Sequence, residues 1–491
     1  MSLTIFEKIL YFLMLPVVAI GAILSPLTND TRIFYGTQYL AYKYFSFPHG
    51  ISYVWEIKPI FSHLFNYCLV AFTCALVPFS NHFVQEIIIK TIAVCLALFA
   101  SWIFSRNVLK IKYSFILCFV SLFACLNVNI LQMEWLAVVL SMIACALFME
   151  SKSYWHYLSG ALLILILLAK GTTGCLIIST ICIVLIFQKK IDWIRGGIGF
   201  IVTGLLFFVA SQTIWPEMLP DIYLAPILSH VGEYSMLSQV YVTAVATVIS
   251  MGIYVPIVGL GLVYGGVWIK NHIHETRAKL LIIAWIAPLI VMWIQSESFP
   301  YQYFPFVLVA IVGLTLYEID TPLERGKKYK RENVVAVSVV ILFVMYLILY
   351  MPFYSYYGSQ ESRMNDYFNN QSEIINNKYD LLNESVLYLD TGSGPYYTNG
   401  ANTSCRFVAP LILQRANPNR SVVRTLPQYW DAYNCTMTYE NRYILTDGPL
   451  GKADGWFGID TPEKINITNK IENEYDVVYT GAWNLYERKE N

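Results

Sequence analysis

Apolar runs long enough to cross a bilayer recur in this chain from Ile9 to Met351 and then stop. A membrane-spanning helix needs about 20 predominantly apolar residues. The composition agrees, because 56% of the 491 residues are hydrophobic and 13% are charged, against roughly 25% charged residues in soluble domains. A single water-soluble globule is therefore excluded. The zero net charge argues against a nucleic-acid-binding protein.

Lysine and arginine residues cluster between the apolar runs, and short cytoplasmic loops carry the excess of these residues. We therefore place the N-terminus and all these basic clusters on the cytoplasmic side. Two consecutive clusters on the same side must be separated by an even number of membrane crossings. That orientation predicts eleven membrane spans, at about residues 9–25, 84–104, 113–131, 134–150, 156–170, 173–188, 196–214, 241–269, 280–295, 303–317 and 334–352. The first helix lacks a small-residue cleavage site, so we expect it to be retained.

One apolar block, residues 60–79, has no crossing to make in this scheme. It contains His63, Asn66, Cys68 and Pro78, and no Lys or Arg follows it between Ser80 and Glu86. We interpret the block as an interfacial or re-entrant segment on the outer side. The predicted fold is a polytopic α-helical membrane body, residues 1–353, followed by a small extracytoplasmic α/β domain, residues 354–491.

The last 138 residues, Tyr354 to Asn491, differ in kind from the body. Alternating stretches at Ser385–Leu389 and Val477–Thr480 predict strands. Six Asn-x-Ser/Thr sequences occur here, which are acceptors only on the outer side, although each one also arises by chance in an Asn-rich segment; they begin at Asn370, Asn383, Asn402, Asn419, Asn434 and Asn466.

Cysteine placement points the same way. Eight of the ten cysteines lie between Cys68 and Cys182 in the apolar body, where a free thiol behaves as a small hydrophobe. Cys405 and Cys435 are the two in the tail. A disulfide between them suits an oxidising exterior.

Ionisable residues at membrane depth are costly and therefore indicate function. The predicted first outer loop, residues 25–59, is longer than the roughly 15 residues of most loops. It holds, among aromatic residues, Asp30, Arg32, Lys43, His49, Glu56 and Lys58. A carboxylate there can act as a general base on a hydroxyl, while a Lys or Arg neutralises a phosphate leaving group. Surface salt bridges of Asp30 with Arg32 and Glu56 with Lys58 are an equally good interpretation.

Four further candidate residues, at three places in the chain, fall at the same predicted level of the membrane. Glu134 begins the fourth span, Lys170 follows an apolar run and precedes Gly171, and Tyr301 and Tyr303 open the tenth span. Each has a plain alternative, since Glu134 and Lys170 can snorkel to the surface and the tyrosines can anchor an interface. Their common side of the membrane favours a site.

In chain order these residues resemble motifs of the GT-C superfamily of glycosyltransferases, in the branch of the protein mannosyltransferases and the aminoarabinose transferase of lipid A. The resemblance covers about residues 1–352. It rests on the acid Asp30 after the first helix, Glu56 with Lys58-Pro59, Glu134, Ala169-Lys170-Gly171 preceded by Gly160, and Tyr303-Phe304-Pro305. The chain departs from the family in Thr31, where a second acid is usual, in the single proline after Lys58, and in Glu rather than Asp at 134.

The resemblance implies inverting transfer of a sugar from a polyprenyl-phosphate carrier to a glycan, lipid or protein acceptor on the outer face. Asp30 would be the base, and Glu56 and Glu134 would orient the sugar or acceptor. The donor phosphate would be bound by Lys58, Arg32 and Lys170, with Tyr301 and Tyr303 nearby. Asp30 and Glu56 are the candidates for holding a divalent cation such as Mg²⁺ or Mn²⁺, a requirement that differs among GT-C enzymes.

Other functions compete with transfer. A transporter or flippase of lipid-linked sugars also has polar groups in a membrane cavity, but often shows inverted repeats, and none is evident here. A non-catalytic subunit with an outer recognition domain leaves the long first loop unexplained. In the tail, Tyr429-Trp430-Asp431-Ala432-Tyr433 weakly resembles an oligosaccharyltransferase signature but lacks its second Trp and Gly, so we expect a buried aromatic strand or loop there.

Overall fold

The structure is a computed structural model. It describes residues 5–24, 29–44, 60–78, 82–109, 133–169, 192–214, 265–274, 351–389, 418–446, 448–450 and 461–490, with isolated positions between them. In residues 5–12, 29–34, 133–134, 351–362 and 418–421, and at some single positions, only the backbone is described. The chain divides into two compact units. The first comprises Met1–Pro26, Ile87–Phe207 and Tyr234–Gly358, and the second comprises Leu27–Glu86, Phe208–Glu233 and Ser359–Asn491.

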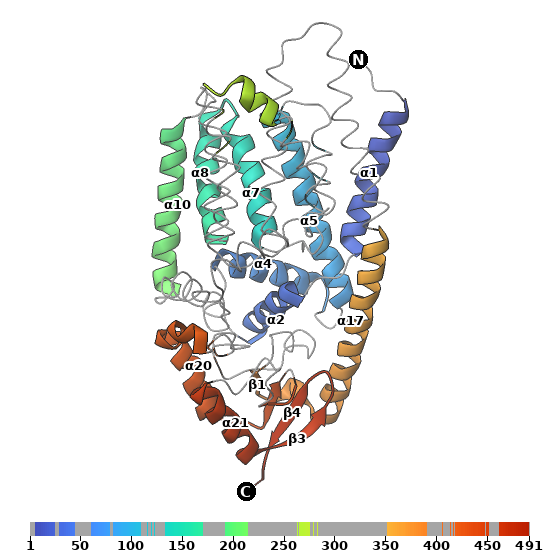
Figure 1. Ribbon diagram of the computed structural model, residues 1–491, viewed down its shortest axis with the longest axis vertical. Helices are drawn as coiled ribbons and strands as arrows, with labels where there is room; N and C mark the ends of the chain where they lie inside the picture. Colours follow the sequence, from blue (N-terminus) through green and yellow to red (C-terminus); the bar gives the residue numbers. More distant parts are fainter. Residues whose placement is uncertain are drawn as a thin grey trace. The chain divides into compact units, whose positions relative to one another are not determined.

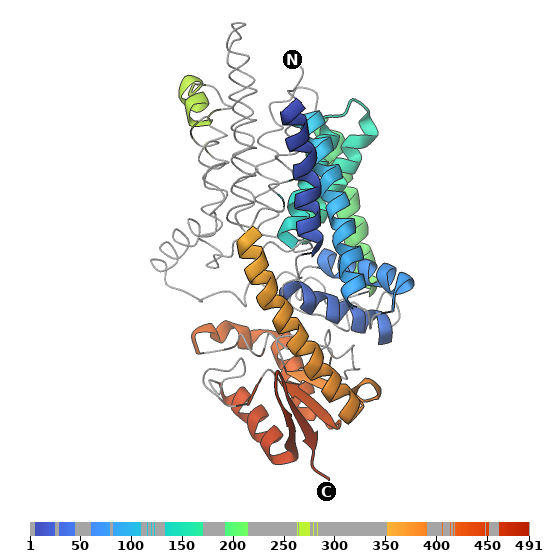
Figure 2. The same ribbon diagram turned by 90° about the vertical axis from the view of Figure 1, so that its right-hand side faces the viewer.

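The first unit is built from apolar helices whose axes run in roughly one direction (Figures 1 and 2). They are α1 (Ile5–Leu24), α5 (His82–Phe104) continued by a π-helical turn (Ser105–Leu109), α7 (Met133–Phe148), α8 (Ser153–Ala169) and α10 (Trp193–Ile214). The first residues of α5, up to Glu86, and the last residues of α10, from Phe208, belong to the second unit. Among the described residues, Val84–Asn107 and Trp193–Thr213 are long and apolar enough to cross a membrane. Shorter apolar helices include Trp135–Phe148 and Ser153–Ala169. The number of eleven spans stays a prediction.

Helices α7 and α8 form an antiparallel hairpin closed by polar contacts. The Ser159 hydroxyl donates to the carbonyl oxygen of Ala144. At the turn, Asn107 Nδ2 donates to Ala146 O (3.1 Å) and to Glu150 Oε1 (2.7 Å). These bonds tie the π-helical turn after α5 to the end of α7.

Glycines bring α8 and α10 together. A Cβ atom at Gly160 would overlap the carbonyl oxygen of Gly196, and one at Gly199 would overlap the carbonyl oxygen of Tyr157. Small residues at such contacts let helix backbones approach closely. The side chains on the other side of α10 remain largely exposed, including Ile194, Ile201 and Leu206.

The second unit contains two helices from the predicted first outer loop and interfacial block. They are α2 (Asn29–Tyr44) and α4 (Ile60–Leu76), which pack against each other. A helix over residues 29–44 was not expected from the sequence. The block predicted at residues 60–79 is a helix as well, and whether it is re-entrant or interfacial stays a prediction.

The same unit holds a C-terminal α/β fold. Its helical elements are α17 (Met351–Tyr379), which belongs to this unit from Ser359 onward, α20 (Pro427–Thr438), α21 (Pro462–Glu474) and the 3₁₀ turns Leu381–Asn383 and Pro418–Thr425. Its strands are β1 (Val386–Leu389), β2 (Tyr443–Thr446), β3 (Tyr475–Thr480) and β4 (Asn484–Arg488). The strands predicted at Ser385–Leu389 and Val477–Thr480 are confirmed by β1 and β3. Since α17 starts at Met351, it runs across residue 354, and a domain boundary there stays a prediction.

The sheet has the strand order β1-β2-β4-β3, with β1 parallel to β2 and the other pairs antiparallel. All residues of β1 and β2 are buried, which requires cover on both faces. Figure 2 shows the sheet between α17 and α21. Contacts of α17 include Phe368 with Trp483, at 5.0 Å between ring centroids, and the Tyr379 hydroxyl, which donates to Val478 O at 2.6 Å.

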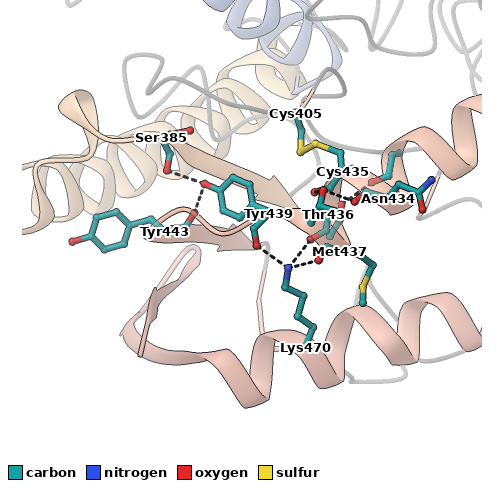
Figure 3. The surroundings of a disulfide bond; sticks show 11 residues. Ser385, Cys405, Asn434, Cys435, Thr436, Met437, Tyr439, Tyr443 and Lys470 are labelled. Atoms are coloured by element: carbon teal, nitrogen blue, oxygen red, sulfur yellow. Dashed lines mark hydrogen bonds between the residues drawn. A yellow bond between two sulfur atoms is a disulfide. The ribbon is translucent and has the colours of Figure 1, made fainter. Parts of the chain in front are cut away.

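The run Tyr429–Tyr433 lies in the helix α20, so the expected strand or loop was wrong. Pro427 occupies the first turn of the helix, where its missing N–H costs nothing. Tyr429 and Ala432 are buried three residues apart, a helical spacing. Cys405 and Cys435 are joined by a disulfide at the C-terminal part of α20 (Figure 3).

Candidate active site

Helix α2 carries the proposed base. Asp30 and Arg32 lie in its first turn, and α2 begins at Asn29, shortly after α1 ends at Leu24. The first N–H groups of a helix lack intrahelical partners, and its N-terminal end carries partial positive charge. Negative charge, such as that of a bound phosphate, is stabilised at such a helix end.

A buried hydroxyl anchors α2 against the two helices that follow. The Tyr35 hydroxyl lies 2.7 Å from Thr73 Oγ1 on α4 and donates to Gln85 Oε1 on α5 at 2.9 Å. Gln85 Nε2 donates in turn to Val77 O at 2.8 Å, just beyond the end of α4. Tyr35 is 2% exposed, and Thr73 and Gln85 are fully buried.

A second polar contact lies one helical turn further along α2. Gln38 Nε2 donates to His63 Nδ1 on α4 at 2.7 Å, and both residues are fully buried. Because an amide nitrogen has no acceptor capacity, Nδ1 accepts, and a neutral His63 ring then carries its hydrogen on Nε2. Asn66, also buried, continues the polar face of α4 between His63 and Thr73.

Two tyrosines of α2, Tyr35 and Tyr39, stay neutral over a wide pH range. Burial raises the pKa of Tyr35 well above its usual value, and this outweighs the opposing effect of the bond to Thr73. Burial also raises the pKa of Tyr39 to about 12. Lys43 Nζ lies over the rings of Tyr44 (4.7 Å) and Tyr39 (5.7 Å). This segment therefore presents neutral hydroxyl donors and a cation.

The other predicted site residues are placed only in part. Glu134 lies in the first turn of α7, in the first unit. Lys170 directly follows the last residue of α8 and lies outside the described residues, as do Glu56, Lys58, Tyr301 and Tyr303. The described side chains contain no group of three or more His, Cys, Asp or Glu residues able to hold a metal ion, and the cation candidates Asp30 and Glu56 are not among them.

Sequence reasoning missed the polar contacts that hold α2. The sequence pattern marks His63 and Asn66 only as residues unsuited to a membrane span, and it does not mark Tyr35, Gln38 or Gln85 at all. A signal existed, since His63, Asn66 and Thr73 stand three and seven residues apart within an apolar stretch. That spacing puts three polar residues on one helix face.

Comparison with known proteins gives the fold but no sequence family. No protein-family model matches the chain, and no curated protein matches it in sequence. Among solved structures, ArnT from Cupriavidus metallidurans in the apo state matches with a TM-score of 0.58 at 12% identity, over 98% of this chain and 97% of that one. The same enzyme bound to undecaprenyl phosphate matches with a TM-score of 0.53, at the same identity and coverage.

A second enzyme gives a similar result. The arabinofuranosyltransferase AftD from Mycobacteria matches with a TM-score of 0.50 at 12% identity, over 100% of this chain and 40% of that one. ArnT, an aminoarabinose transferase, and AftD are both GT-C glycosyltransferases. The chain therefore shares the fold of these GT-C glycosyltransferases, which are polytopic membrane enzymes, and the predicted resemblance to them is confirmed at the level of the fold.

Proposed function

We propose that this protein is an inverting glycosyltransferase that moves a sugar from a polyprenyl-phosphate carrier to an acceptor on the outer face of a membrane. The observation that carries the proposal is the fold shared over almost the whole chain with ArnT, one of whose structures holds undecaprenyl phosphate. The order of Asp30, Glu56, Lys58, Glu134 and Lys170 along the sequence supports it independently.

In the proposed reaction Asp30 takes the proton of the acceptor hydroxyl. The acceptor oxygen then forms a bond to the anomeric carbon of the sugar, on the face opposite the phosphate. The bond between that carbon and the phosphate oxygen breaks, and the electron pair leaves with polyprenyl phosphate. A base in this role contributes about 10²- to 10⁴-fold to the rate.

Charge neutralisation stabilises the leaving group. Lys58, with Arg32 or Lys170, binds the phosphate through charge-assisted hydrogen bonds, and Tyr301 and Tyr303 donate to the same group. Arg32 shares the first turn of α2 with Asp30, so one helix supplies both the base and a phosphate ligand. In this proposal Glu56 and Glu134 orient the sugar or the acceptor, and Asp30 and Glu56 are the candidates for holding a divalent cation.

The topology needed for this reaction is part of the proposal. The N-terminus is cytoplasmic, the C-terminal domain is outside, and the lipid tail of the carrier lies between helices of the body. The disulfide between Cys405 and Cys435 supports an oxidising location for the C-terminal domain.

Asp30→Asn in membranes tests the base assignment. We expect transfer from a radiolabelled polyprenyl-phosphate sugar to fall at least about 100-fold, with the protein level unchanged. The matched control is Asp366→Asn, at an exposed position of α17, which should transfer at the wild-type rate. Transfer by Asp30→Asn at the wild-type rate would show that Asp30 is not the base.

A further inference from the structure

The contact between α2 and α4 is made by buried polar side chains, although an apolar contact would cost less free energy. Tyr35, Gln38, His63, Thr73 and Gln85 are at most 2% exposed. Burial of a polar group costs free energy unless it is hydrogen-bonded, and an apolar pair of similar shape would pack two helices without that cost. Hydrogen bonds add directionality. The buried polar set thus specifies one orientation of α2.

Two separate hydrogen bonds restrict that orientation. Tyr35 and Gln38 are three residues apart and share one face of α2. Tyr35 bonds to Thr73 near the C-terminal end of α4, whereas Gln38 bonds to His63 near its N-terminal end. Two anchors at opposite ends of α4 set both the rotation and the axial position of α2. Gln85 links the Tyr35 anchor to the start of α5.

We propose that Tyr35, Gln38, His63, Thr73 and Gln85 are positioning residues, which act by fixing α2 and thereby the place of Asp30 and Arg32 in the site. The inference rests on the proposed function, in which Asp30 is the base. Asp30 lies five residues before Tyr35 on the same helix, about 7.5 Å along the axis. A displacement of about 1 Å at a reacting group can cost roughly 100-fold in rate.

The protonation state of Tyr35 suits this role. Burial raises the pKa of its hydroxyl above the usual value, so the group remains a donor to Gln85 at any physiological pH. The anchor is therefore permanent rather than switchable.

The test compares hydroxyl removal at two threonines. Thr73→Val deletes the partner of Tyr35, while Thr91→Val deletes an exposed hydroxyl that bonds only to Ile87 O among the described residues. Because the Tyr35 hydrogen goes to Gln85, the Thr73 hydroxyl donates to Tyr35. Each threonine Oγ1 also lies close to a carbonyl oxygen of its own helix, at 2.9 Å from Leu69 O for Thr73 and at 2.7 Å from Ile87 O for Thr91. We expect Thr73→Val to lower kcat about 10- to 100-fold with KM for the polyprenyl-phosphate sugar changed less than twofold. Thr91→Val should match the wild type.

Conservative variants separate positioning from a general loss of fold. Thr73→Ser keeps the hydroxyl and should restore kcat to within about threefold of the wild type. Tyr35→Phe should reproduce the effect of Thr73→Val, whereas Tyr42→Phe, an exposed tyrosine on the same helix, should have none. A normal kcat in Thr73→Val and Tyr35→Phe overturns the inference, as does an equal loss in Thr73→Ser.

A double variant asks whether the effect passes through Asp30. If α2 acts by placing the base, Tyr35→Phe should cost much less in an Asp30→Glu background, where the carboxylate is already displaced. Fully multiplicative losses contradict positioning. If Asp30→Glu is inactive, the comparison of Thr73→Val with Thr73→Ser decides alone.

These outcomes can be told apart from a failure of the proposed function. Full activity of Asp30→Asn shows that Asp30 is not the base. An inactive Asp30→Asn together with a normal Thr73→Val refutes only the role of the positioning residues.

Discussion

One lysine side chain caps the C-terminal end of α20 by hydrogen-bonding to its last carbonyl oxygens. Lys470 on α21 donates from Nζ to the carbonyl oxygens of Thr436 (3.4 Å), Met437 and Tyr439 (2.7 Å) (Figure 3). The last carbonyls of a helix lack intrahelical partners, and a cation there is favoured by the helix dipole. Tyr439 extends the connection, because its hydroxyl donates to Ser385 O (2.8 Å) and lies 2.9 Å from Tyr443 O.

Lys470→Met should therefore destabilise the C-terminal domain. We expect the free energy of unfolding to fall by about 1–3 kcal/mol, because three carbonyl oxygens lose a charged donor. The measurement is chemical unfolding of the full chain in detergent, followed by the fluorescence of tail tryptophans. Lys378→Met is the control, since Lys378 is exposed and lies over the ring of Tyr379, a contact worth below about 1 kcal/mol. Equal effects of the two variants would contradict the assignment.

Two tail tyrosines make the domain sensitive to alkali. Burial, helped by Glu487, raises the pKa of Tyr443 to about 12, and burial raises that of Tyr475 to about 12 as well. Unfolded tyrosines ionise near pH 10. The stabilisation from keeping both hydroxyls neutral is thus present below about pH 10 and is lost between about 10 and 12.

The thermal unfolding temperature of the chain should accordingly decline over that interval. Lys470 works in the opposite direction, since burial lowers its pKa and deprotonation relieves the cost of burying its charge. Tyrosinate absorbance of the native protein should rise in two stages, exposed residues first. In Tyr443→Phe the second stage should shrink. If the absorbance of the native protein rises in a single stage near pH 10, the buried tyrosines do not cause the loss of stability in alkali.

At the scale of elements, the packing of α8 against α10 depends on close contact between their backbones at glycine residues. Gly199→Ala should force the helices apart, because the added Cβ would overlap the carbonyl oxygen of Tyr157. We expect a lower unfolding temperature and a lower yield of folded protein. Gly197→Ala is a close control two residues away, where a Cβ meets nothing within 4 Å and alanine is the better helix former by about 1 kcal/mol. Equal stability of the two variants would show that the contact is not required.

The elements also show what sequence patterns predict and what they miss. Apolar helices such as α5 and α10 follow from length and composition, and β1 and β3 follow from alternation. Helix α2 was not predicted, because its buried face carries the polar residues Tyr35 and Gln38 and its sequence therefore shows no helical period of apolar residues. Helix α20 was predicted as a strand or loop, because its many aromatic residues are typical of strands. The spacing of Tyr429 and Ala432 indicates a helix, but it involves only two residues.

The candidate site divides in the same way. Local signals located Asp30, Arg32 and Glu134, and the structure places each in the first turn of a helix. The partners of α2 were not predictable, since the bonds from Tyr35 to Thr73 and Gln85 span 38 and 50 residues. No local pattern encodes contacts over such separations.

For the whole molecule, the zero net charge conceals two different halves. Residues 1–353 carry 21 basic and 16 acidic residues, whereas residues 354–491 carry 12 and 17. The basic excess of the body gives the predicted cytoplasmic side, and the acidic tail agrees with the proposed exterior. The GT-C fold shared with ArnT and AftD joins these halves into one proposed enzyme.

The most direct test of this account is mass spectrometry of surface glycans and glycolipids. Cells lacking the gene should lose one sugar residue from one class of acceptor. The wild-type gene should restore that residue, and the Asp30→Asn gene should not. The donor, a polyprenyl-phosphate sugar, should accumulate in the deficient cells. A surface profile that is unchanged when the gene is removed would contradict the proposal that this chain transfers a sugar.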